Sequence, residues 1–311
     1  MRWVIQLLLL TSIPACCALA ATEPSLDELK AKALGGDVNS QLILGGKYDY
    51  GHGVRQNYKE AAKWYGMAAN AGSGLGQNNL GSLYLQGQGT SKDYAKALEL
   101  FRKAADQHNS QAMCSIGLMY DSGYGVQKDP AEANAWYRKA ADAGDTNAMY
   151  NLGLSYEQGA GVTADAAEAF AWFEKAAKLG HVISQRQVGY RYYNGIGVTK
   201  NPTEAIIWYR KAAILGDVKA AANIGIAYMN GTGVSINKIE AFAWLDIARF
   251  KTQLWHDDMR TKWGIRGFLD DLKKNMSRAE IKAGEARAKQ LVEELKTENS
   301  PLARPNQLSL F

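Results

Sequence analysis

The sequence is poor in the residues on which metal proteins depend. Only 3 of its 311 residues are cysteine and only 4 are histidine. A metal site needs such ligands at a recognisable spacing, for example two histidines four residues apart on one helix. The histidines are scattered and none stands beside a cysteine pair: His52, His108, His181 and His256. We therefore expect neither a metal ion nor another cofactor.

The cysteines also speak against a disulfide framework. Cys16 and Cys17 fall within the first twenty residues, and Cys114 stands alone. If the first twenty residues are removed, Cys114 has no partner. We interpret it as a small core residue of a helix rather than as a reactive thiol.

Catalytic motifs are missing as well. The chain has no phosphate-binding glycine loop, because every Gly-x-Gly pair recurs at one fixed spacing as part of a repeated turn. The segment Ser235–Lys238 matches the S-x-x-K nucleophile motif, but its companion motifs are absent and Asn237 is expected to begin a helix. We predict that the protein is not an enzyme.

A strong charge of one sign is lacking in most of the chain. Residues 249–311 hold 13 Lys/Arg and 9 Asp/Glu, while residues 21–248 carry no net charge. Nucleic-acid binding requires a basic stripe, so we expect no nucleic-acid partner. The basic C-terminal part could bring the protein to an anionic membrane surface, although interspersed charges on a helix are usually a solvated face.

The only long apolar run lies at the N-terminus. Residues 1–20 have the form of a secretory signal peptide, with Arg2 before an apolar stretch and Ala18-Leu19-Ala20 as the cleavage site. This predicts a mature chain that starts at Ala21 in the periplasm or outside the cell. Two alternatives stay open, which are a lipoprotein anchored through Cys16 and an uncleaved anchor.

A 36-residue period organises the rest of the sequence. Residues 40–248 hold six copies without an insertion, so that Gly153 has counterparts in every copy: Gly45, Gly81, Gly117, Gly189 and Gly225. A fixed period of this size predicts a solenoid built from one repeated unit. Small and apolar residues at the spacing of one helical stripe predict a first helix in each unit, with the glycine facing a neighbouring helix.

The second helix of each unit follows a glycine turn. Each is expected to begin at an Asn or Asp that caps its first turn: Asn57, Asp93, Asp129, Asp165, Asn201 and Asn237. Five of these have a glutamate three residues later, in the arrangement of a capping box. The aromatic residues of this helix, such as Trp172 and Phe173, are expected in the core. Gly72, Gly144, Gly180 and Gly216 close it, and His108 replaces the glycine once.

The two ends of the solenoid need polar caps. Residues 21–39 predict a capping helix that begins with a capping box at Ser25–Glu28. Residues 249–297 predict a C-terminal helical cap with a second capping box at Ser277–Glu280. Its expected core residues are Trp255, Trp263, Phe268, Leu269 and Leu272. Residues 298–311 contain two prolines and little periodicity, and we expect a mobile tail.

The repeated pattern L-G-x-x-Y-x-x-G-x-G-V followed by D-x-x-x-A-x-x-W-Y-x-K-A-A-x-x-G resembles the Sel-1-like repeat family, a relative of the tetratricopeptide repeats. The resemblance covers residues 40–248 and is of the bacterial exported type. It implies an all-α, right-handed α-solenoid that acts as an adaptor between proteins. It brings no catalytic motif.

In proteins of this kind the first helices line the concave side, so the resemblance implies a binding groove there. The exposed stripe of each first helix is expected at offsets such as Asn151, Ser155 and Gln158. These positions vary between copies, and amide side chains both donate and accept hydrogen bonds. We predict that a partner binds at Asn79, Gln86, Met119, Asn151, Gln158, Gln187, Arg191, Asn194, Asn223 and Asn230. The alternative is that these residues only keep the helices soluble.

Three functional hypotheses follow. The first is an adaptor or regulator of the bacterial cell envelope that binds a protein or peptide segment in the concave groove. The second is an immunity protein that neutralises a secreted toxic effector. The third is a peptidoglycan or carbohydrate binder that uses exposed aromatics such as Tyr50, Tyr124 and Tyr193. The sequence does not indicate an oligomeric state.

Overall fold

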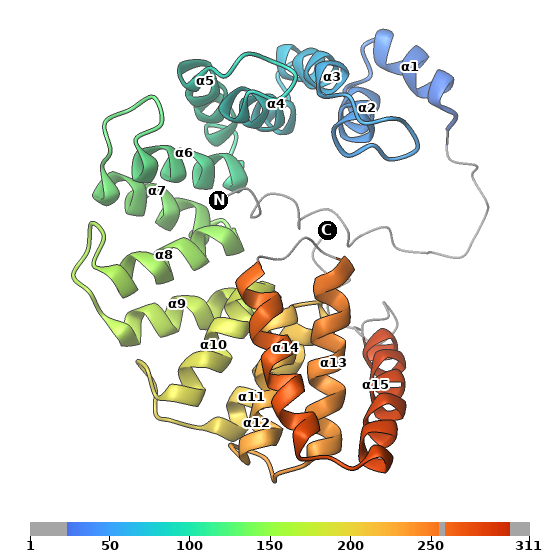
Figure 1. Cartoon of the computed structure of the whole chain (residues 1–311). Coiled ribbons are helices and arrows are strands. Elements are labelled where there is room, and N and C mark those ends of the chain that lie inside the picture. The colour runs from blue at the N-terminus through green and yellow to red at the C-terminus, as the bar shows by residue number, and fades with distance from the viewer. Residues whose placement is uncertain (1–23, 255–258, 299–311) are drawn as a thin grey trace.

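The computed structural model describes residues 24–254 and 259–298. Within these ranges the chain forms fifteen α-helices and no strand. The helices follow one another along an arc that runs from α1 to α13 (Figure 1). The predicted signal peptide, the lipidation site Cys16 and residues 299–311 of the predicted tail lie outside the described residues, whereas Glu298 ends the last helix.

The repeats are helix pairs, as the period predicts. The first helices, here called the A helices, are α2 (Val38–Tyr50), α4 (Gly74–Gln86), α6 (Ser110–Ser122), α8 (Thr146–Gln158), α10 (Val182–Asn194) and α12 (Val218–Asn230). The second helices, the B helices, are α3 (Tyr58–Asn70), α5 (Tyr94–Ala105), α7 (Pro130–Asp142), α9 (Ala166–Lys178), α11 (Pro202–Ile214) and α13 (Lys238–Leu254). Each A helix packs on its own B helix and, except at the start of the array, on the preceding B helix.

The repeated glycine of each A helix makes room for a side chain of its own B helix. This confirms the prediction that the glycine faces a neighbouring helix. A Cβ atom on this glycine would stand 2.4 to 2.9 Å from the facing side chain. The facing pairs are Gly45 and Tyr65, Gly81 and Phe101, Gly117 and Tyr137, Gly153 and Phe173, Gly189 and Tyr209, and Gly225 and Leu245. Small residues on one helix and large rings on the other therefore build the core of the solenoid.

The turn between the two helices depends on its paired glycines. All twelve have a φ between 68° and 78°, which side chains with a Cβ rarely adopt. The second glycine of a pair also touches the preceding repeat. A Cβ on Gly161 would lie 2.4 Å from the carbonyl carbon of Pro130, at the start of the preceding B helix.

The B helices begin at the predicted caps, but only one of the two hydrogen bonds of each predicted capping box forms. All six Asn and Asp side chains accept hydrogen bonds from N–H groups of the first turn. The N–H of each cap does not reach the glutamate three residues on. It donates to the carbonyl oxygen of a repeated tyrosine in the A helix, as Asp165 does to Tyr156 at 2.9 Å. The cap thus fixes the second helix to the first.

Both ends of the array carry additional helices. The N-terminal cap is α1 (Leu26–Leu34), which begins with the predicted reciprocal capping box of Ser25 and Glu28. The C-terminal cap consists of α14 (Met259–Lys274) and α15 (Arg278–Glu298), and α15 begins with the predicted box of Ser277 and Glu280.

The cap helices add to the core of the last repeats. Leu269 and Leu272 are buried as predicted, whereas Phe268 is 41% exposed because it lies on the outer side of α14. Trp255 lies outside the described residues, and so does the side chain of Trp263.

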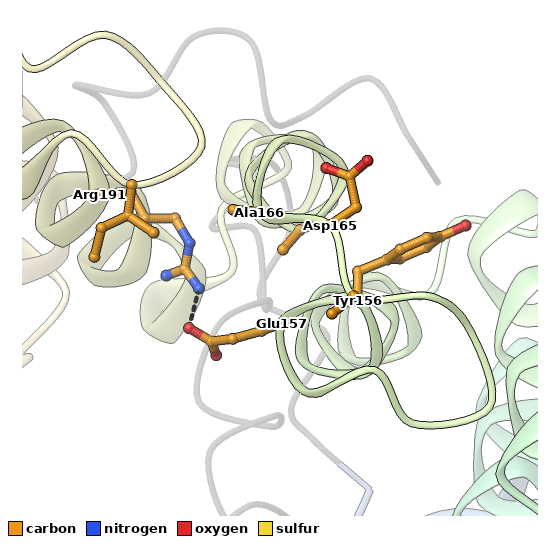
Figure 2. A pocket seen from close by; sticks show the side chains of 8 residues that line it. Tyr156, Glu157, Asp165, Ala166 and Arg191 are labelled. Carbon is orange, nitrogen blue, oxygen red and sulfur yellow. Dashed lines mark hydrogen bonds and ion pairs between the residues drawn. The ribbon is translucent and has the colours of Figure 1, made fainter.

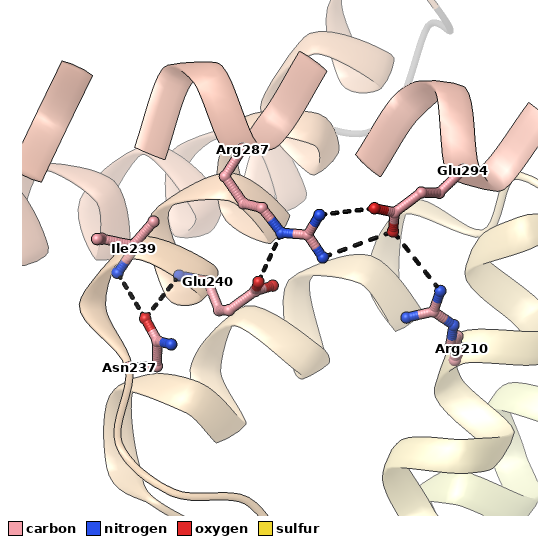
Figure 3. Close-up of polar contacts among 6 residues, drawn as sticks. All are labelled: Arg210, Asn237, Ile239, Glu240, Arg287 and Glu294. Carbon is pink, nitrogen blue, oxygen red and sulfur yellow. Dashed lines mark hydrogen bonds and ion pairs between the residues drawn. The ribbon is translucent and has the colours of Figure 1, made fainter. Parts of the chain in front are cut away.

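An arginine joins α15 to the solenoid (Figure 3). Nε of Arg287 donates to Glu240 of α13 at 2.6 Å, and its Nη1 donates to Glu294 at 2.7 Å. Glu294 also lies 4.0 Å from Arg210 of α11. Ion pairs therefore connect α15 to α13 and to α11, the two B helices that it contacts.

Candidate functional site: the A-face and a pocket at its edge

The outer sides of the A helices form a surface that we call the A-face. It consists of three residues from each A helix, at the positions of Asn151, Leu154 and Gln158 in α8. Counterparts of Asn151 are Ile43, Asn79, Ser115, Gln187 and Asn223; of Leu154, Gly46, Ser82, Leu118, Tyr190 and Ile226; and of Gln158, Tyr50, Gln86, Ser122, Asn194 and Asn230. All eighteen are half-buried or exposed. Whether this face is concave stays a prediction.

The two end positions of the predicted stripe are half-buried or exposed, whereas the middle position is not part of the surface in most copies. The middle position is buried in four copies, with Leu83 2% exposed, Met119 0%, Arg191 1% and Ala227 0%. Met119 packs in the core cluster that contains Phe101. The residue four positions after the first one turns toward the neighbouring repeat, whereas the residue three positions after it faces out. Met119 and Arg191 therefore do not lie on the A-face, which corrects their predicted place in it.

The line of the A-face through Leu154, which is apolar from the third repeat to the sixth, was not predicted from the sequence. Leu118 is 36% exposed and Tyr190 is 47% exposed, and Leu154 and Ile226 are half-buried beside them. Their apolar character made them look like core residues. Large apolar side chains at one repeat position of four consecutive repeats are the sequence signal that could have identified them.

The amides at the inner position are partly used within the protein. Asn79, Asn151, Gln187 and Asn223 are half-buried. Asn79 accepts from Asn78 at 3.2 Å, Asn151 donates to the sulfur of Cys114 at 3.8 Å, and Gln187 accepts from Arg191 at 3.0 Å. At the outer position Gln86 is half-buried, and Gln158, Asn194 and Asn230 are exposed. The outer amides are thus the more accessible ones.

None of the eighteen A-face residues is charged. Across the whole sequence 22% of the residues are Asp, Glu, Lys or Arg, and such residues normally dominate exposed helix faces. Plain helix solubility would favour charges here. A continuous face of amides and apolar side chains is better suited to contact another neutral surface.

The aromatic residues considered for carbohydrate binding are less exposed than expected. Tyr50, Tyr124 and Tyr193 are all half-buried. Tyr124 stacks on Tyr94 with ring centroids 5.2 Å apart, and burial raises the pKa of Tyr50 to about 12. These rings do not form an open platform of the kind that a sugar stacks on.

A pocket of about 230 Å³ lies at the edge of the A-face, between the fourth and fifth repeats. Its charged wall is formed by Arg191 near the end of α10 and Glu157 near the end of α8 (Figure 2). Nη2 of Arg191 donates to Oε1 of Glu157 at 2.7 Å. The guanidinium also lies over the ring of Phe173, 4.1 Å from its centroid. Burial lowers the pKa of Arg191 from its usual value.

The other polar side chains of the pocket lining face elsewhere. In Figure 2 the side chains of Arg191 and Glu157 reach toward one another, whereas the carboxylate of Asp165 and the ring of Tyr156 point away from them. Asp165 accepts from the backbone N–H groups of Ala167 and Glu168 as the cap of α9. The remaining lining is apolar: Ala164, Ala166, Ala169 and Ile196.

The described residues contain no group of His, Cys, Asp and Glu side chains that could hold a metal ion. The S-x-x-K segment has no catalytic geometry, because Asn237 caps α13 and Lys238 donates to the carbonyl oxygen of Asn275 at 2.7 Å. Cys114 is a free thiol whose pKa is raised by burial, as its interpretation as a core residue requires. No helix in residues 24–254 or 259–298 has the length and apolar character needed to cross a bilayer.

Stacked helix pairs with a continuous side-chain face define an interaction scaffold of the α-solenoid class. The family model described as Sel1 repeat matches six consecutive segments: residues 38–73, 74–109, 110–145, 146–181, 182–217 and 218–248. These matches cover more than half of the sequence, and the chain belongs to the Sel1 repeat family. Proteins of this family mediate contacts between proteins and are generally not enzymes.

Solved structures agree with this assignment. A Sel1 repeat protein from Oxalobacter formigenes is 36% identical, with a TM-score of 0.65 over 73% of this chain and 90% of that one. The protein c5321, a protective antigen of uropathogenic Escherichia coli strains, is 22% identical over 92% of this chain and 90% of its own, with a TM-score of 0.52, and shows the fold alone. The immunity protein Pa5087 from Pseudomonas aeruginosa is 20% identical over 81% of this chain and 84% of its own, and its TM-score of 0.45 supports no functional argument. No curated protein matches the chain.

Proposed function

We propose that the protein is an exported adaptor or regulator of the bacterial cell envelope that binds a protein segment along its A-face. The observation that carries the proposal is the absence of charge from this face over six repeats. An exposed charge must lose its water when a partner covers it, and this cost is recovered only by a matching charge. Amides and apolar side chains avoid that cost.

The arrangement of the A-face suits an extended segment. The apolar line through Leu118, Leu154, Tyr190 and Ile226 can contact side chains of the segment. The outer amides of Gln158, Asn194 and Asn230 can donate to and accept from its backbone. An extended chain offers such groups at regular intervals, as a solenoid does.

Affinity capture with two matched variants tests the proposal. In the first variant, Leu118→Lys and Tyr190→Lys place two charges on the A-face. The control Ile207→Lys places a charge on the opposite helix layer, at a side chain of α11 that is 47% exposed. We expect one envelope protein to bind the native chain and the control, and to bind the A-face variant at least tenfold more weakly. Equal binding to all three would exclude the A-face.

The captured partner also decides between the two interaction hypotheses. A secreted toxic enzyme would make this chain an immunity protein, and a resident envelope protein would make it an adaptor. The carbohydrate hypothesis has lost its supporting observation, because its aromatic residues are half-buried. Cosedimentation of the chain with purified cell wall, unaffected by the A-face variant, would restore it.

Export is the second part of the proposal and is supported by the pattern of residues 1–20. Mass spectrometry of the protein from its native envelope reads the processing directly. A chain that begins at Ala21 fits cleavage by the general signal peptidase. A lipid on Cys16 at a new N-terminus would show a membrane-anchored lipoprotein instead, and an intact N-terminus would contradict export by cleavage.

A further inference from the structure

We propose that the pocket beside Arg191 binds a primary carboxamide, namely the side chain of a Gln or Asn residue of the bound segment. The inference rests on the proposed function, because it concerns the segment that lies along the A-face. It names one chemical group that this segment should present at the fourth and fifth repeats.

The first observation is an incomplete hydrogen-bonding edge on a buried arginine. A guanidinium offers Nε–H and one Nη2–H side by side, in a fork that two oxygen atoms can fill. In Arg191 the Nη2 group donates to Glu157 at 2.7 Å, but the buried Nε has no acceptor among the described residues. Its Nη1 group donates to the side chain of Gln187 at 3.0 Å. The Nε–H group of Arg191 is therefore a donor without an acceptor.

Three other ion-paired arginines do not share this feature. Nε of Arg186 donates to Asp217 at 3.0 Å, Nε of Arg249 to Asp246 at 3.0 Å, and Nε of Arg287 to Glu240 at 2.6 Å. All three are more exposed than Arg191, whose side chain is only 1% exposed. An unsatisfied N–H is thus found at the arginine for which it costs most.

Arg191 is the one buried charged residue at its repeat position, since Lys47 and Ser155 at the same position of the first and fourth repeats are half-buried. Its counterparts in the second, third and sixth repeats are Leu83, Met119 and Ala227, which fill the space between repeats without any polar group. An apolar residue would meet the packing need at this position. Burial of an arginine with an open donor is better explained by a ligand that supplies the acceptor.

The pocket supplies the space for such a ligand. Its volume of about 230 Å³ is lined by Arg191 and Glu157, and its other walls are mainly alanine and isoleucine side chains. Glu157 is 43% exposed and uses only its Oε1 atom toward Arg191, so its Oε2 atom can accept a further hydrogen bond. The pocket thus offers one donor and one acceptor above an apolar wall.

A carboxamide is complementary to this pair of groups. Its oxygen can accept from Nε–H of Arg191, and its NH₂ can donate to Oε2 of Glu157. A carboxylate would complete the fork as well, but it would meet the negative charge of Glu157 and has no donor for it. A cationic group would be repelled by the positive charge of the buried guanidinium. A neutral ligand also agrees with the uncharged A-face.

The Nε–H signal of Arg191 in a ¹H–¹⁵N NMR spectrum of the whole chain is the direct readout. The signal is assigned from its loss in Arg191→Lys or, if that variant does not fold, from its proximity to the Phe173 ring protons. Three probes are titrated: the N-acetyl methylamides of glutamine, methionine and glutamate. They share the same backbone amides and differ only in the side chain.

We expect the glutamine compound alone to shift the Arg191 signal in a saturable way, with a dissociation constant on the order of 1 mM for a ligand of this size. The Nε–H signal of Arg186, which already has its acceptor, should not move. Equal shifts with the methionine compound would assign the effect to backbone amides and overturn the proposal. A shift with glutamate alone, or no shift with any probe, would overturn it too.

Glu157→Gln tests the other half of the contact. The new amide oxygen can still accept from Arg191, but its NH₂ group replaces the acceptor that the ligand needs. We expect binding of the glutamine compound to weaken at least fivefold, and unchanged binding would contradict the role of Glu157. Because these titrations read the pocket itself, their failure would leave the A-face proposal standing, and the charge variants at Leu118 and Tyr190 would still decide that proposal.

Discussion

Gly189 of α10 lies directly against the ring of Tyr209 in α11, so that a Cβ atom on the glycine would stand 2.7 Å from two ring carbons. A gap of this size accommodates no methyl group, and the backbone oxygen of Ala205 would be only 3.1 Å away. A similar contact recurs in every repeat, with an aromatic ring in five of them and Leu245 in the sixth. The close approach of the two helices of a repeat therefore depends on this glycine.

We expect Gly189→Ala to destabilise the protein by about 1 to 3 kcal/mol, because overpacking outweighs the better helix propensity of alanine. Gly66→Ala is the matched control, since a Cβ on this helical glycine meets nothing within 4 Å. It should stabilise the protein by up to about 1 kcal/mol. Urea unfolding of both variants gives the two free energies. Stabilisation by both alanines would show that the helices can move apart without cost.

His108 occupies a position that favours glycine. It has a φ of 61° and is the only non-glycine residue with positive φ in the part of the chain that the structure describes. Four other repeats end the B helix with a glycine whose φ is 88° to 97°. His108→Gly should therefore raise the free energy of unfolding by about 1 kcal/mol, because a Cβ atom is strained in this region. Thermal unfolding measures the gain, and a lower melting temperature would show that the imidazole makes a compensating contact.

His181 should make the solenoid sensitive to acid. It caps α10, where Nδ1 accepts from the N–H of Ser184 at 3.3 Å, and burial lowers its pKa to about 4. The ring also lies against Tyr150, with centroids 5.3 Å apart. In the unfolded chain the pKa is about 6.5. The unfolded state therefore binds the proton first, and stability falls as the pH decreases from about 6.5 toward 4.

Replacement by the cap residue of the neighbouring repeats tests this. Asp145 and Asp217 stand at the same position, so His181→Asp keeps a capping side chain and removes the imidazole. Between pH 7 and pH 4.5 we expect the native protein to lose about 2 to 3 kcal/mol more than the variant. Urea midpoints at the two pH values give the difference. Parallel losses in both proteins would assign the acid sensitivity to other groups.

The C-terminal cap should depend on salt. Arg287 is 27% exposed and Glu240 is 19% exposed, so their contact is only partly screened by water. A double-mutant cycle with Arg287→Met and Glu240→Gln should give a coupling energy of about 1 kcal/mol at low ionic strength. In 0.5 M salt we expect the coupling to fall by about half or more. A coupling that is absent at low salt would mean that apolar packing alone holds α15.

Most of the fold could be predicted because the sequence repeats itself. Gly153 and its counterparts predicted helix pairs in close contact, and Asp165 and its counterparts predicted where the second helices begin. The reciprocal half of the capping boxes could not be predicted, because the competing acceptor is a backbone carbonyl of another helix. Side-chain patterns do not show such acceptors.

The candidate site was predicted less completely. An ideal helix turns by 100° per residue, so the residues three and four positions after Asn151 differ in direction by a full quarter turn. The choice between Leu154 and Ser155 therefore depends on how neighbouring repeats are rotated, which no single repeat determines. The burial of Arg191 was missed for a related reason. Its partner Glu157 lies 34 residues earlier and is brought to it only by stacking of the repeats.

Photo-crosslinking on the A-face tests the central claim most directly. Tyr190 is replaced by the crosslinking amino acid p-benzoylphenylalanine in one variant, and Ile207 in the other, since both side chains are 47% exposed and they lie on the two different helix layers. The variants are produced in cells of the organism in which the protein naturally occurs. Irradiation of these cells should link position 190, but not position 207, to one protein. A mass-spectrometric map should place the link in a single segment of that protein. Adducts at 207 alone, or none at 190 under conditions in which the partner is present, would contradict binding along the A-face.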